Sequence, residues 1–339
     1  MFPQTDDAVF LIDAPALAGL TFRRFRGPSD YAAIATVGNA ARGADGTEWV
    51  VTVDDVARMY AHLVNSDPAR DMVIAEVEGE MVGFVRSEWS REEIGLFRYK
   101  FWPAVLPQWR GQGIRRALLR WMEARIREIA AEHPADTPKV FSTSAQAQAQ
   151  SLIDLLEGEG YRPVRTFHRM VRSLEGSLPD FAMPDGLAMR PVLPEHYRLI
   201  WDASNEAFHD HWGYSPEPEE SYQEWLEDKV IFTPELWQIA WDVATNEVAG
   251  QVGTFIDRLE NEKFNRRRGY TEYISVRQPY RRRGLARALI AESLRVLKAE
   301  GMTESALFVD AENISGATRL YEECGFRTVD QSMAYQKQL

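Results

Sequence analysis

The chain contains an internal repeat, and this repeat constrains the possible folds more than any other feature of the sequence. Three landmarks of the first half return in the second at nearly constant separations of 167, 171 and 165 residues: Gly83 and Gly250, Gly113 and Gly284, Tyr161 and Phe326. A period of this length is that of a whole domain. The sequence of 339 residues therefore predicts two domains of one fold, each large enough to bury its own core.

Both halves show the same order of predicted elements. Short runs of β-branched and aromatic residues alternate with stretches whose apolar residues recur at helical spacing. A hairpin is predicted over 71–77 and 81–85, and its counterpart over 237–243 and 248–256. This pattern predicts an α/β (α+β) fold in which helices flank a mixed sheet. The first 19 or so residues are left unassigned.

A segment rich in glycine and proline separates the two halves. It covers residues 176–186 and predicts a linker. The predicted domains are therefore residues 1–175 and residues 187–339.

One loop of the second half predicts an anion site. A predicted strand end at 273–276 leads through Gly284 into an amphipathic helix that carries Ile290, Leu294 and Leu297 on one face. The first N–H groups of a helix lack internal partners and carry the positive end of the helix dipole. A glycine at this point lets a phosphate approach the backbone. The alternative is that Gly284 only makes a turn.

Two motifs in this half resemble the signatures of the GNAT acetyltransferase family. The first is the acyl-CoA pyrophosphate loop, with the pattern Arg/Gln-x-x-Gly-x-Gly/Ala, which Arg281, Gly284 and Ala286 match. The second is matched by Asn313, Ala317, Leu320, Tyr321, Gly325 and Phe326. The resemblance implies two tandem GNAT-like domains, each with a mixed, mostly antiparallel sheet.

The resemblance also implies acetyl-CoA as co-substrate and the residues that would bind it. These are Ile274 and Val276 through their backbone, the loop residues Arg281, Arg282, Arg283, Gly284, Leu285 and Ala286, and Asn313. For Asn313 the alternative is a capping role at the start of the following short helix, because asparagine favours that position.

The first copy departs from these motifs at three positions. Arg115 stands in place of Ala286, Gln148 in place of Asn313, and Leu156 in place of Tyr321. Leucine cannot transfer a proton. We therefore expect the first copy to be structural, or to bind CoA without turnover.

Two residues of the second copy are predicted to be catalytic. The resemblance implies that Tyr321 is the general acid that protonates the leaving CoA thiolate, and a phenol suits this role. A core tyrosine is the alternative. Where many family members place a glutamate base this chain has Tyr270, but Glu272 lies two residues on and on the same strand face. Glu272 could take a proton from the attacking ammonium, or could be a salt-bridge partner of 266–268.

The acceptor is predicted to bind near the connection between the first two helices of the second copy, at 208–214. His209, His211 and Trp212 are the candidate contacts there. The alternative is an aromatic cluster that closes the helical corner. A metal site is not expected, because two histidines at i and i+2 of a helix diverge and no cysteine is near.

Composition excludes several other classes. A net charge of −12 argues against nucleic acid as the main partner. No apolar run is long enough to span a membrane, so a cytoplasmic location is expected, with no membrane partner. A single cysteine, Cys324, excludes an internal disulfide. A duplicated chain can imitate a homodimer, so a monomer is slightly favoured.

The predicted function is acetyl transfer from acetyl-CoA to a primary amine of a small molecule, by direct attack and without metal. The tandem arrangement with one weak copy also resembles the mycothiol synthases, which implies acetylation of a thiol-cofactor precursor as an alternative. A non-catalytic acyl-CoA-binding or regulatory protein is the alternative from another class.

Overall fold

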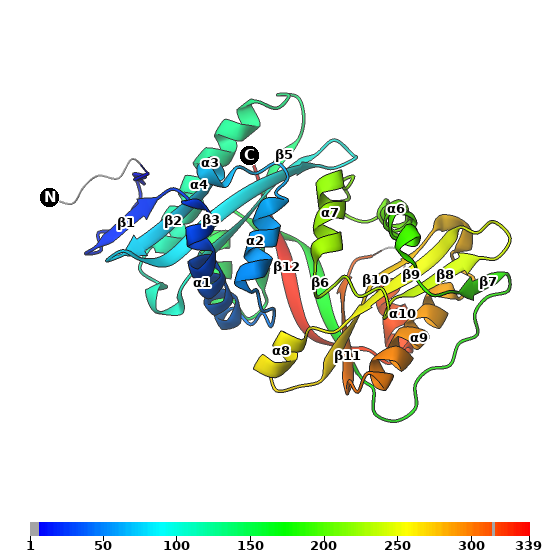
Figure 1. Cartoon of the computed structure of the whole chain (residues 1–339). Helices are drawn as coiled ribbons and strands as arrows, with labels where there is room; N and C mark the ends of the chain where they lie inside the picture. Colours follow the sequence, from blue (N-terminus) through cyan, green and yellow to red (C-terminus); the bar gives the residue numbers. More distant parts are fainter. Residues whose placement is uncertain (1–6, 314–315) are drawn as a thin grey trace. The chain divides into compact units, whose positions relative to one another are not determined.

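The computed structural model describes residues 7–313 and 316–339 (Figure 1). The chain divides into two compact units. Unit 1 comprises the chain up to Arg165 together with Ser332–Leu339, and unit 2 comprises Thr166–Gln331.

Unit 1 is built on a mixed sheet. Its strands lie in the order β1 (Leu20–Arg23), β2 (Met72–Val77), β3 (Glu80–Arg91), β4 (Phe97–Val105), β5 (Lys139–Gln146) and β12 (Arg327–Gln338). Neighbours are antiparallel except β4 and β5, which are parallel. The α-helices described are α1 (Tyr31–Ala44), α2 (Val53–Ala61), α3 (Pro68–Asp71), α4 (Ile114–Ala131) and α5 (Gln150–Gly158).

Unit 2 has the same plan. Its strands lie in the order β6 (Arg162–Ser173), β11 (Glu304–Asp310), β10 (Arg268–Val276), β9 (Val248–Phe255), β8 (Gln238–Asp242) and β7 (Leu187–Met189). Among the strand pairs described in this unit, β10 and β11 are parallel and the others antiparallel. The α-helices described are α6 (Tyr197–Phe208), α7 (Glu219–Glu227), α8 (Arg258–Lys263), α9 (Leu285–Ala299) and α10 (Ala317–Glu323). The predicted mixed α/β fold with two similar domains is confirmed.

The compact units and the sequence repeat differ in their last strand. From Phe167 onward, β6, which ends the first repeat, pairs with β11 of the second. Residues Ser332–Gln338 of β12, which ends the second repeat, pair with β5 of the first. Because both copies share one fold, each offers the same open strand edge, and the closing strand of either copy can satisfy its hydrogen bonds. The units therefore do not end where the predicted domains do, at 175 and 187.

In each unit, side chains on both faces of the sheet pack against helices. In β2, Met72 and Ile74 pack with α1 and α2, while Val73, Ala75 and Val77 join the cluster that contains the apolar face of α4. This alternation is the period of two that a strand imposes on its side chains. β8 repeats it, with Trp241 on the α6 side and Ala240 on the α9 side. A strand covered on both faces is apolar throughout, which is why both hairpins were visible in the sequence.

The structure adds elements that the sequence analysis did not predict. α3 and α8 are short helices whose first turns are capped by Asp67 and Asp257. β10 begins at Arg268, five residues before the predicted strand end at 273, and residues 7–9 pair along the outer edge of β1. Short capped helices carry no apolar period, so they leave little trace in a periodicity search.

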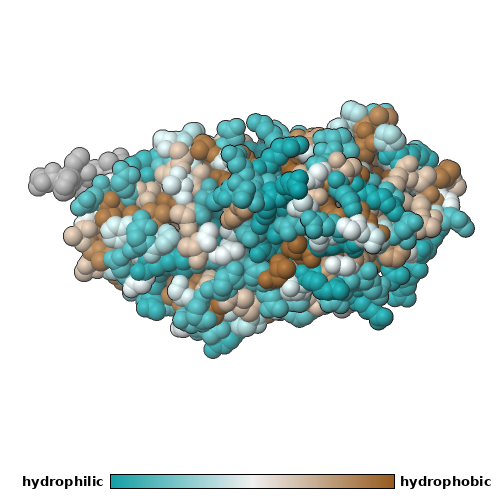
Figure 2. Space-filling view, turned by 90° about the horizontal axis from the view of Figure 1, so that it is seen from below, coloured by the Kyte–Doolittle hydropathy of each residue, from teal (hydrophilic) through white to brown (hydrophobic). Residues whose placement is uncertain are grey.

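The surface agrees with the charged composition. On the face drawn in Figure 2, hydrophilic residues predominate and hydrophobic ones form small separate patches. Among the described residues, no helix is both long and apolar enough to cross a membrane.

Candidate active site

The loop between β10 and α9 forms the predicted anion cradle. Gly284 is the N-cap of α9 in the left-handed conformation, with φ of 89°, and no side chain caps the helix. A Cβ built on Gly284 would meet nothing within 4 Å, so the space over this helix start is open. Leu285 is buried in the core and Ala286 is half-buried. The loop thus presents backbone N–H groups at the positive end of a helix of 15 residues.

Arg281 contacts protein groups on all sides of its guanidinium. It donates to the carbonyl oxygens of Val276 and Ala207, at 3.0 Å each, and pairs with Asp210 at 2.7 Å. These contacts tie the loop to the end of β10 and to the end of α6. The geometry gives Arg281 a positioning role, and its contact with a cofactor remains a prediction.

The other two loop arginines are exposed. Arg282 adopts a left-handed conformation with φ of 61°. Arg283 donates to the carbonyl oxygen of Asp185, at 2.7 Å, in the predicted linker. Both side chains lie at the surface beside the open helix start, where cations would complement phosphate.

A β-bulge changes the course of β10 just before this loop. Glu272 pairs with Gly253 and Ser275 pairs with Gln251, so β10 carries one extra residue there. Tyr273 takes the left-handed conformation with φ of 50°. A Cβ on Gly253 would lie 2.9 Å from the Tyr273 ring, so a glycine at position 253 leaves room for that ring. A bulge of this kind re-aims the side chains that follow it.

β10 and β11 separate at the bulge. Their parallel pairing runs only from Arg268–Glu304 to Tyr270–Ala306. Beyond that point the Phe308 N–H is bound by the carboxylate of Glu272, at 2.6 Å. Ile274 and Val276 follow on the side of β10 that packs towards α9. The predicted backbone contacts at these two residues therefore lie where the sheet opens.

Glu272 has the electrostatic properties of a base. Burial raises the pKa of its carboxyl to about 8, although hydrogen bonds from the Phe308 and Tyr273 backbone act in the opposite direction. A carboxyl with this pKa can exchange protons with an amine near neutral pH. Arg268 pairs with Glu304 and Arg266 with Glu260. The alternative of a salt bridge between Glu272 and residues 266–268 therefore finds no support among these contacts.

Tyr321 lies on α10 and has 7% of its surface exposed. Burial, followed by the negative charge of Glu272, raises the pKa of its phenol. Its ring packs edge-on against Phe326, with 6.4 Å between the centroids. The hydroxyl thus stays protonated at neutral pH, which is the state that a general acid requires.

Asn313 lies in the turn between β11 and α10. Its N–H donates to the Asp310 carbonyl oxygen at 3.2 Å, and its own carbonyl oxygen accepts from the Gly316 N–H at 3.3 Å. Gly316, with φ of 75°, is the N-cap of α10, and no side chain caps this helix. The N-cap position of α10 is thus occupied by Gly316, and both roles considered for Asn313 stay predictions. Ile314 and Ser315 of the second motif lie outside the described residues.

The predicted acceptor residues contact aromatic rings. His211 lies edge-on to Phe208 at 4.6 Å, and Trp212 lies 6.1 Å from Phe167 of β6, between ring centroids. His209 lies 5.2 Å from the Tyr214 ring. The aromatic cluster at the helical corner therefore exists. Burial and the charge of Arg281 lower the pKa of His211, while Asp310 at the end of β11 raises it.

Tyr270 occupies the position at which the resemblance predicts a glutamate. It is buried, and its hydroxyl donates to Glu260 of α8. Burial and the charge of Glu260 raise its pKa. The sequence analysis missed Glu260, because α8 leaves no periodic signal. Within residues 7–313 and 316–339, no group of three His, Cys, Asp or Glu side chains is placed to hold a metal ion.

Comparisons with known proteins match both halves of the chain. A model of the acetyltransferase (GNAT) family matches residues 196–326, and a model of the GNAT acetyltransferase domain matches residues 68–152. The chain belongs to the GNAT acetyltransferase family, as a protein with two such domains, and it is an acyltransferase.

Its relatives cover nearly the whole chain. The mycothiol acetyltransferase of Thermobispora bispora is 28% identical, and the match covers 89% of this chain and 95% of the relative. The mycothiol acetyltransferase of Salinispora arenicola is 27% identical, and the match covers 91% of this chain and 94% of the relative. The crystal structure of a GCN5-related N-acetyltransferase from Sphaerobacter thermophilus is similar to this chain, with 27% identity and a TM-score of 0.68. The match covers 94% of this chain and 95% of that protein. A tandem GNAT protein from the clavulanic acid biosynthesis pathway shares the fold, with 16% identity and a TM-score of 0.64 over 94% and 98%.

Proposed function

We propose that the second copy of the repeat transfers an acetyl group from acetyl-CoA to a primary amine of a small molecule. The observation that carries this proposal is the opening between β10 and β11. Glu272 lies in this opening, its charge acts on Tyr321, and the anion cradle at Gly284 follows directly on β10. These three observations support a proposed base, a proposed acid and a proposed phosphate site around one gap in the sheet.

The fit of acetyl-CoA rests on the open helix start. The N–H groups that follow Gly284 suit the pyrophosphate, with Arg282 and Arg283 beside them. Ile274 and Val276 follow the bulge in β10, Asn313 lies in the turn after β11, and these three residues are the further proposed contacts. When bound, acetyl-CoA supplies an acetyl group activated as a thioester.

Proton transfer is assigned to two side chains. The Glu272 carboxylate takes a proton from the ammonium group of the acceptor, so that its nitrogen has a lone pair for attack. The new C–N bond forms while the C–S bond breaks. The Tyr321 hydroxyl gives its proton to the departing sulfur, which neutralises the charge that develops there. The nitrogen loses its second proton as the amide forms, and this proton restores the phenol. His209, His211 and Trp212 form the proposed acceptor wall at the end of β11.

A second candidate function follows from the relatives. Proteins named mycothiol acetyltransferase match this chain at 28% identity over 89% of its length. We therefore keep acetylation of a thiol-cofactor precursor as the alternative acceptor chemistry.

Release of CoA thiol in the presence of a panel of amines tests the proposal. The panel contains simple primary amines and an aminothiol conjugate of a sugar. We expect wild type to release CoA with at least one member, and Tyr321→Phe to bind acetyl-CoA equally well with turnover lost. A wild type that binds acetyl-CoA tightly and turns over no amine would support a non-catalytic acyl-CoA-binding protein instead.

A further inference from the structure

Unit 1 contains a cavity that the proposed acetyl transfer does not use. Its volume is about 780 Å³, and it lies between α1, the turn from β2 to β3 and the segment after β4. Small apolar side chains of α1 form one wall, among them Ala32 and Ala33, and Trp109 lines another part. This volume is typical of small-molecule sites.

The charged residues among its described lining are acidic. Glu78 and Glu80 line the cavity at the turn between β2 and β3, and both are exposed. Lys, Arg and His are missing from the described lining. The site thus combines apolar walls, an aromatic ring and negative charge, and it lacks the cations that a phosphate or CoA would need.

The second copy shows what occupies the corresponding place there. Leu106 donates its N–H to the Val82 carbonyl oxygen, and Arg277 donates its N–H to the Ala249 carbonyl oxygen. Val82 and Ala249 are 167 residues apart, the offset of the hairpins. Leu106 and Arg277 are therefore equivalent, and the same offset makes Glu80 and Glu247 equivalent.

Arg277 fills the space in the second copy. Its guanidinium contacts Glu206 at 2.8 Å, Glu247 at 3.5 Å and the Val248 carbonyl oxygen at 3.2 Å. Leucine at position 106 leaves Glu80 without this cation in the first copy.

The cavity wall formed by α1 also carries a smaller side chain than the corresponding helix of the second copy, α6. Ala41 of α1 and Ala207 of α6 each accept a hydrogen bond from the loop arginine of their copy, which aligns the two helices at an offset of 166. Ala33 then corresponds to Leu199. The first copy thus has the uncharged Leu106 where the second has Arg277, and the smaller Ala33 where the second has Leu199. The acidic residue is present in both copies, as Glu80 and Glu247.

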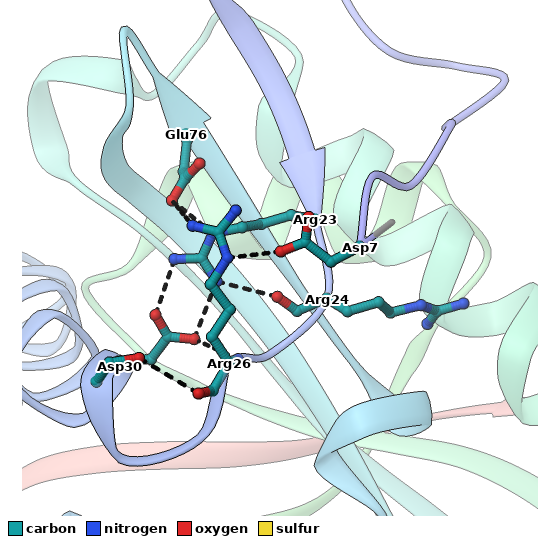
Figure 3. A network of polar contacts seen from close by, with 7 residues as sticks. Asp7, Arg23, Arg24, Arg26, Asp30 and Glu76 are labelled. Carbon is teal, nitrogen blue, oxygen red and sulfur yellow. Dashed lines mark hydrogen bonds and ion pairs between the residues drawn. The ribbon is translucent and has the colours of Figure 1, made fainter. Parts of the chain in front are cut away.

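A buried ion cluster holds the α1 wall in place. Arg23 of β1 pairs with Asp30 at the start of α1, at 2.8 Å, and with Glu76 of β2, at 2.6 Å (Figure 3). All three residues are at most 9% exposed. Figure 3 shows Arg26 and Asp7 joined to the same cluster. The start of α1, the helix that forms one wall of the cavity, is thereby tied to β1 and β2.

From this geometry we propose that the cavity in unit 1 binds a small organic cation, a guanidinium or ammonium group on an apolar body. Glu80 and Glu78 receive the charge, as Glu247 receives Arg277 in the second copy. Trp109 and the alanines of α1 contact the apolar body, and the ring face can attract the cation.

Calorimetric titration with butylguanidine tests the proposal, with butylurea as a neutral ligand of the same shape. We expect one site for butylguanidine and binding of butylurea at least fivefold weaker. In Glu80→Gln the affinity for butylguanidine should fall about threefold to fivefold, the effect of losing one exposed charge partner. Equal binding of the two ligands, or no binding of butylguanidine at millimolar concentration, would overturn the proposal.

Two variants locate the site. Ala33→Leu introduces the residue of the second copy and should abolish butylguanidine binding while the thermal unfolding temperature stays within a few degrees. Leu106→Arg supplies the cation internally and should act in the same way. Tyr321→Phe should leave the binding unchanged. Binding that survives in folded Ala33→Leu, or that is lost in Tyr321→Phe, would place the ligand elsewhere and overturn the proposal.

Discussion

The two copies of the repeat share a scaffold but differ where their central strands separate. In both, a left-handed glycine opens the helix after the loop, with φ of 89° at Gly113 and at Gly284. In both copies, the loop arginine donates hydrogen bonds to equivalent carbonyl oxygens, one at the end of a strand and one near the end of a helix. These shared contacts maintain the fold.

The two copies differ at the positions proposed to take part in proton transfer. β3 and β4 pair without interruption from Gly83–Val105 to Arg91–Phe97, whereas β9 and β10 contain the bulge. In the first copy Arg86 of β3 pairs with Trp102 of β4, and at the equivalent place in the second copy Gly253 of β9 pairs with Glu272 of β10. Trp102 therefore occupies the position of Glu272. Leu156, fully buried, stands for Tyr321. The first copy thus has no counterpart of the proposed base or of the proposed acid.

The helix start of the first copy is also covered. A Cβ on Gly113 would lie 3.3 Å from Pro15 in the N-terminal segment, whereas the space at Gly284 is open. Arg115 turns inward and pairs with Asp45 at 3.3 Å, beside Arg110. The copy proposed to be active therefore differs from the other in its bulge, its open cradle and two side chains.

Removal of the proposed acid should have the largest effect. Tyr321→Phe should lower kcat by about 10²- to 10⁴-fold, the range for a lost general acid, with the dissociation constant of acetyl-CoA unchanged. Steady-state kinetics and calorimetry measure both. Tyr161→Phe is the matched control, because Tyr161 donates to buried Glu123 at 3.0 Å in the first copy. It should lower the unfolding temperature and leave kcat unaltered. Loss of activity in the control alone would reverse the assignment of the copies.

Replacement of the proposed base should alter the pH profile. Glu272 must be ionised to act, so kcat/KM of wild type should rise with pH and level off above about 8. Glu272→Gln should lower kcat/KM by about 10²-fold and remove this ascending limb. A limb that persists in the variant would assign the titration to another group.

The same carboxyl gives an independent readout in stability. Its pKa in the folded protein lies above the ordinary glutamate value of 4.5. The folded state therefore holds its proton at higher pH than the unfolded state, and its stabilising contribution is present below pH 4.5 and lost as pH rises to about 8. Glu272→Gln should unfold at a higher temperature than wild type above pH 8, and the difference should fade below pH 4.5. An unchanged difference across this range would contradict the assigned burial.

The loop arginines should separate binding from stability. Arg281→Ala frees the loop from Ala207 and Asp210 and should weaken acetyl-CoA binding about tenfold, which corresponds to about 1.4 kcal/mol. Arg110→Ala breaks the equivalent contacts in the first copy and should lower the unfolding temperature only. Equal effects of the two variants on acetyl-CoA affinity would show that both loops bind it.

The smallest effect is expected from a single methyl group on the backbone. Gly284→Ala meets no neighbour, so its cost is that of a left-handed alanine, about 1 to 2 kcal/mol. We expect acetyl-CoA affinity to fall a few-fold, measured by titration. Gly113→Ala should leave this affinity unchanged, although Pro15 must yield to the new Cβ. A stronger loss in Gly113→Ala than in Gly284→Ala would contradict an open cradle in the second copy alone.

Much of the fold could be predicted from the sequence, because strands buried on both faces and amphipathic helices have regular apolar patterns. The glycine before an amphipathic helix located the open helix start at Gly284, and the repeat showed that Leu156 takes the place of Tyr321. The exchange of β6 and β12 could not be predicted, since the two closing strands satisfy the same edge. The bulge at Tyr273 was hidden as well, because its only local sign is a glycine at 253 on the neighbouring strand. Arg281 illustrates the limit of a motif, since its side chain holds the loop through protein contacts.

The most direct test of the assignment to one copy is the stoichiometry of acetyl-CoA binding by calorimetry, in wild type, Gly284→Tyr and Gly113→Tyr. The account predicts one site in wild type, none in Gly284→Tyr and one in Gly113→Tyr. Two sites in wild type, or one site lost only in Gly113→Tyr, would contradict it.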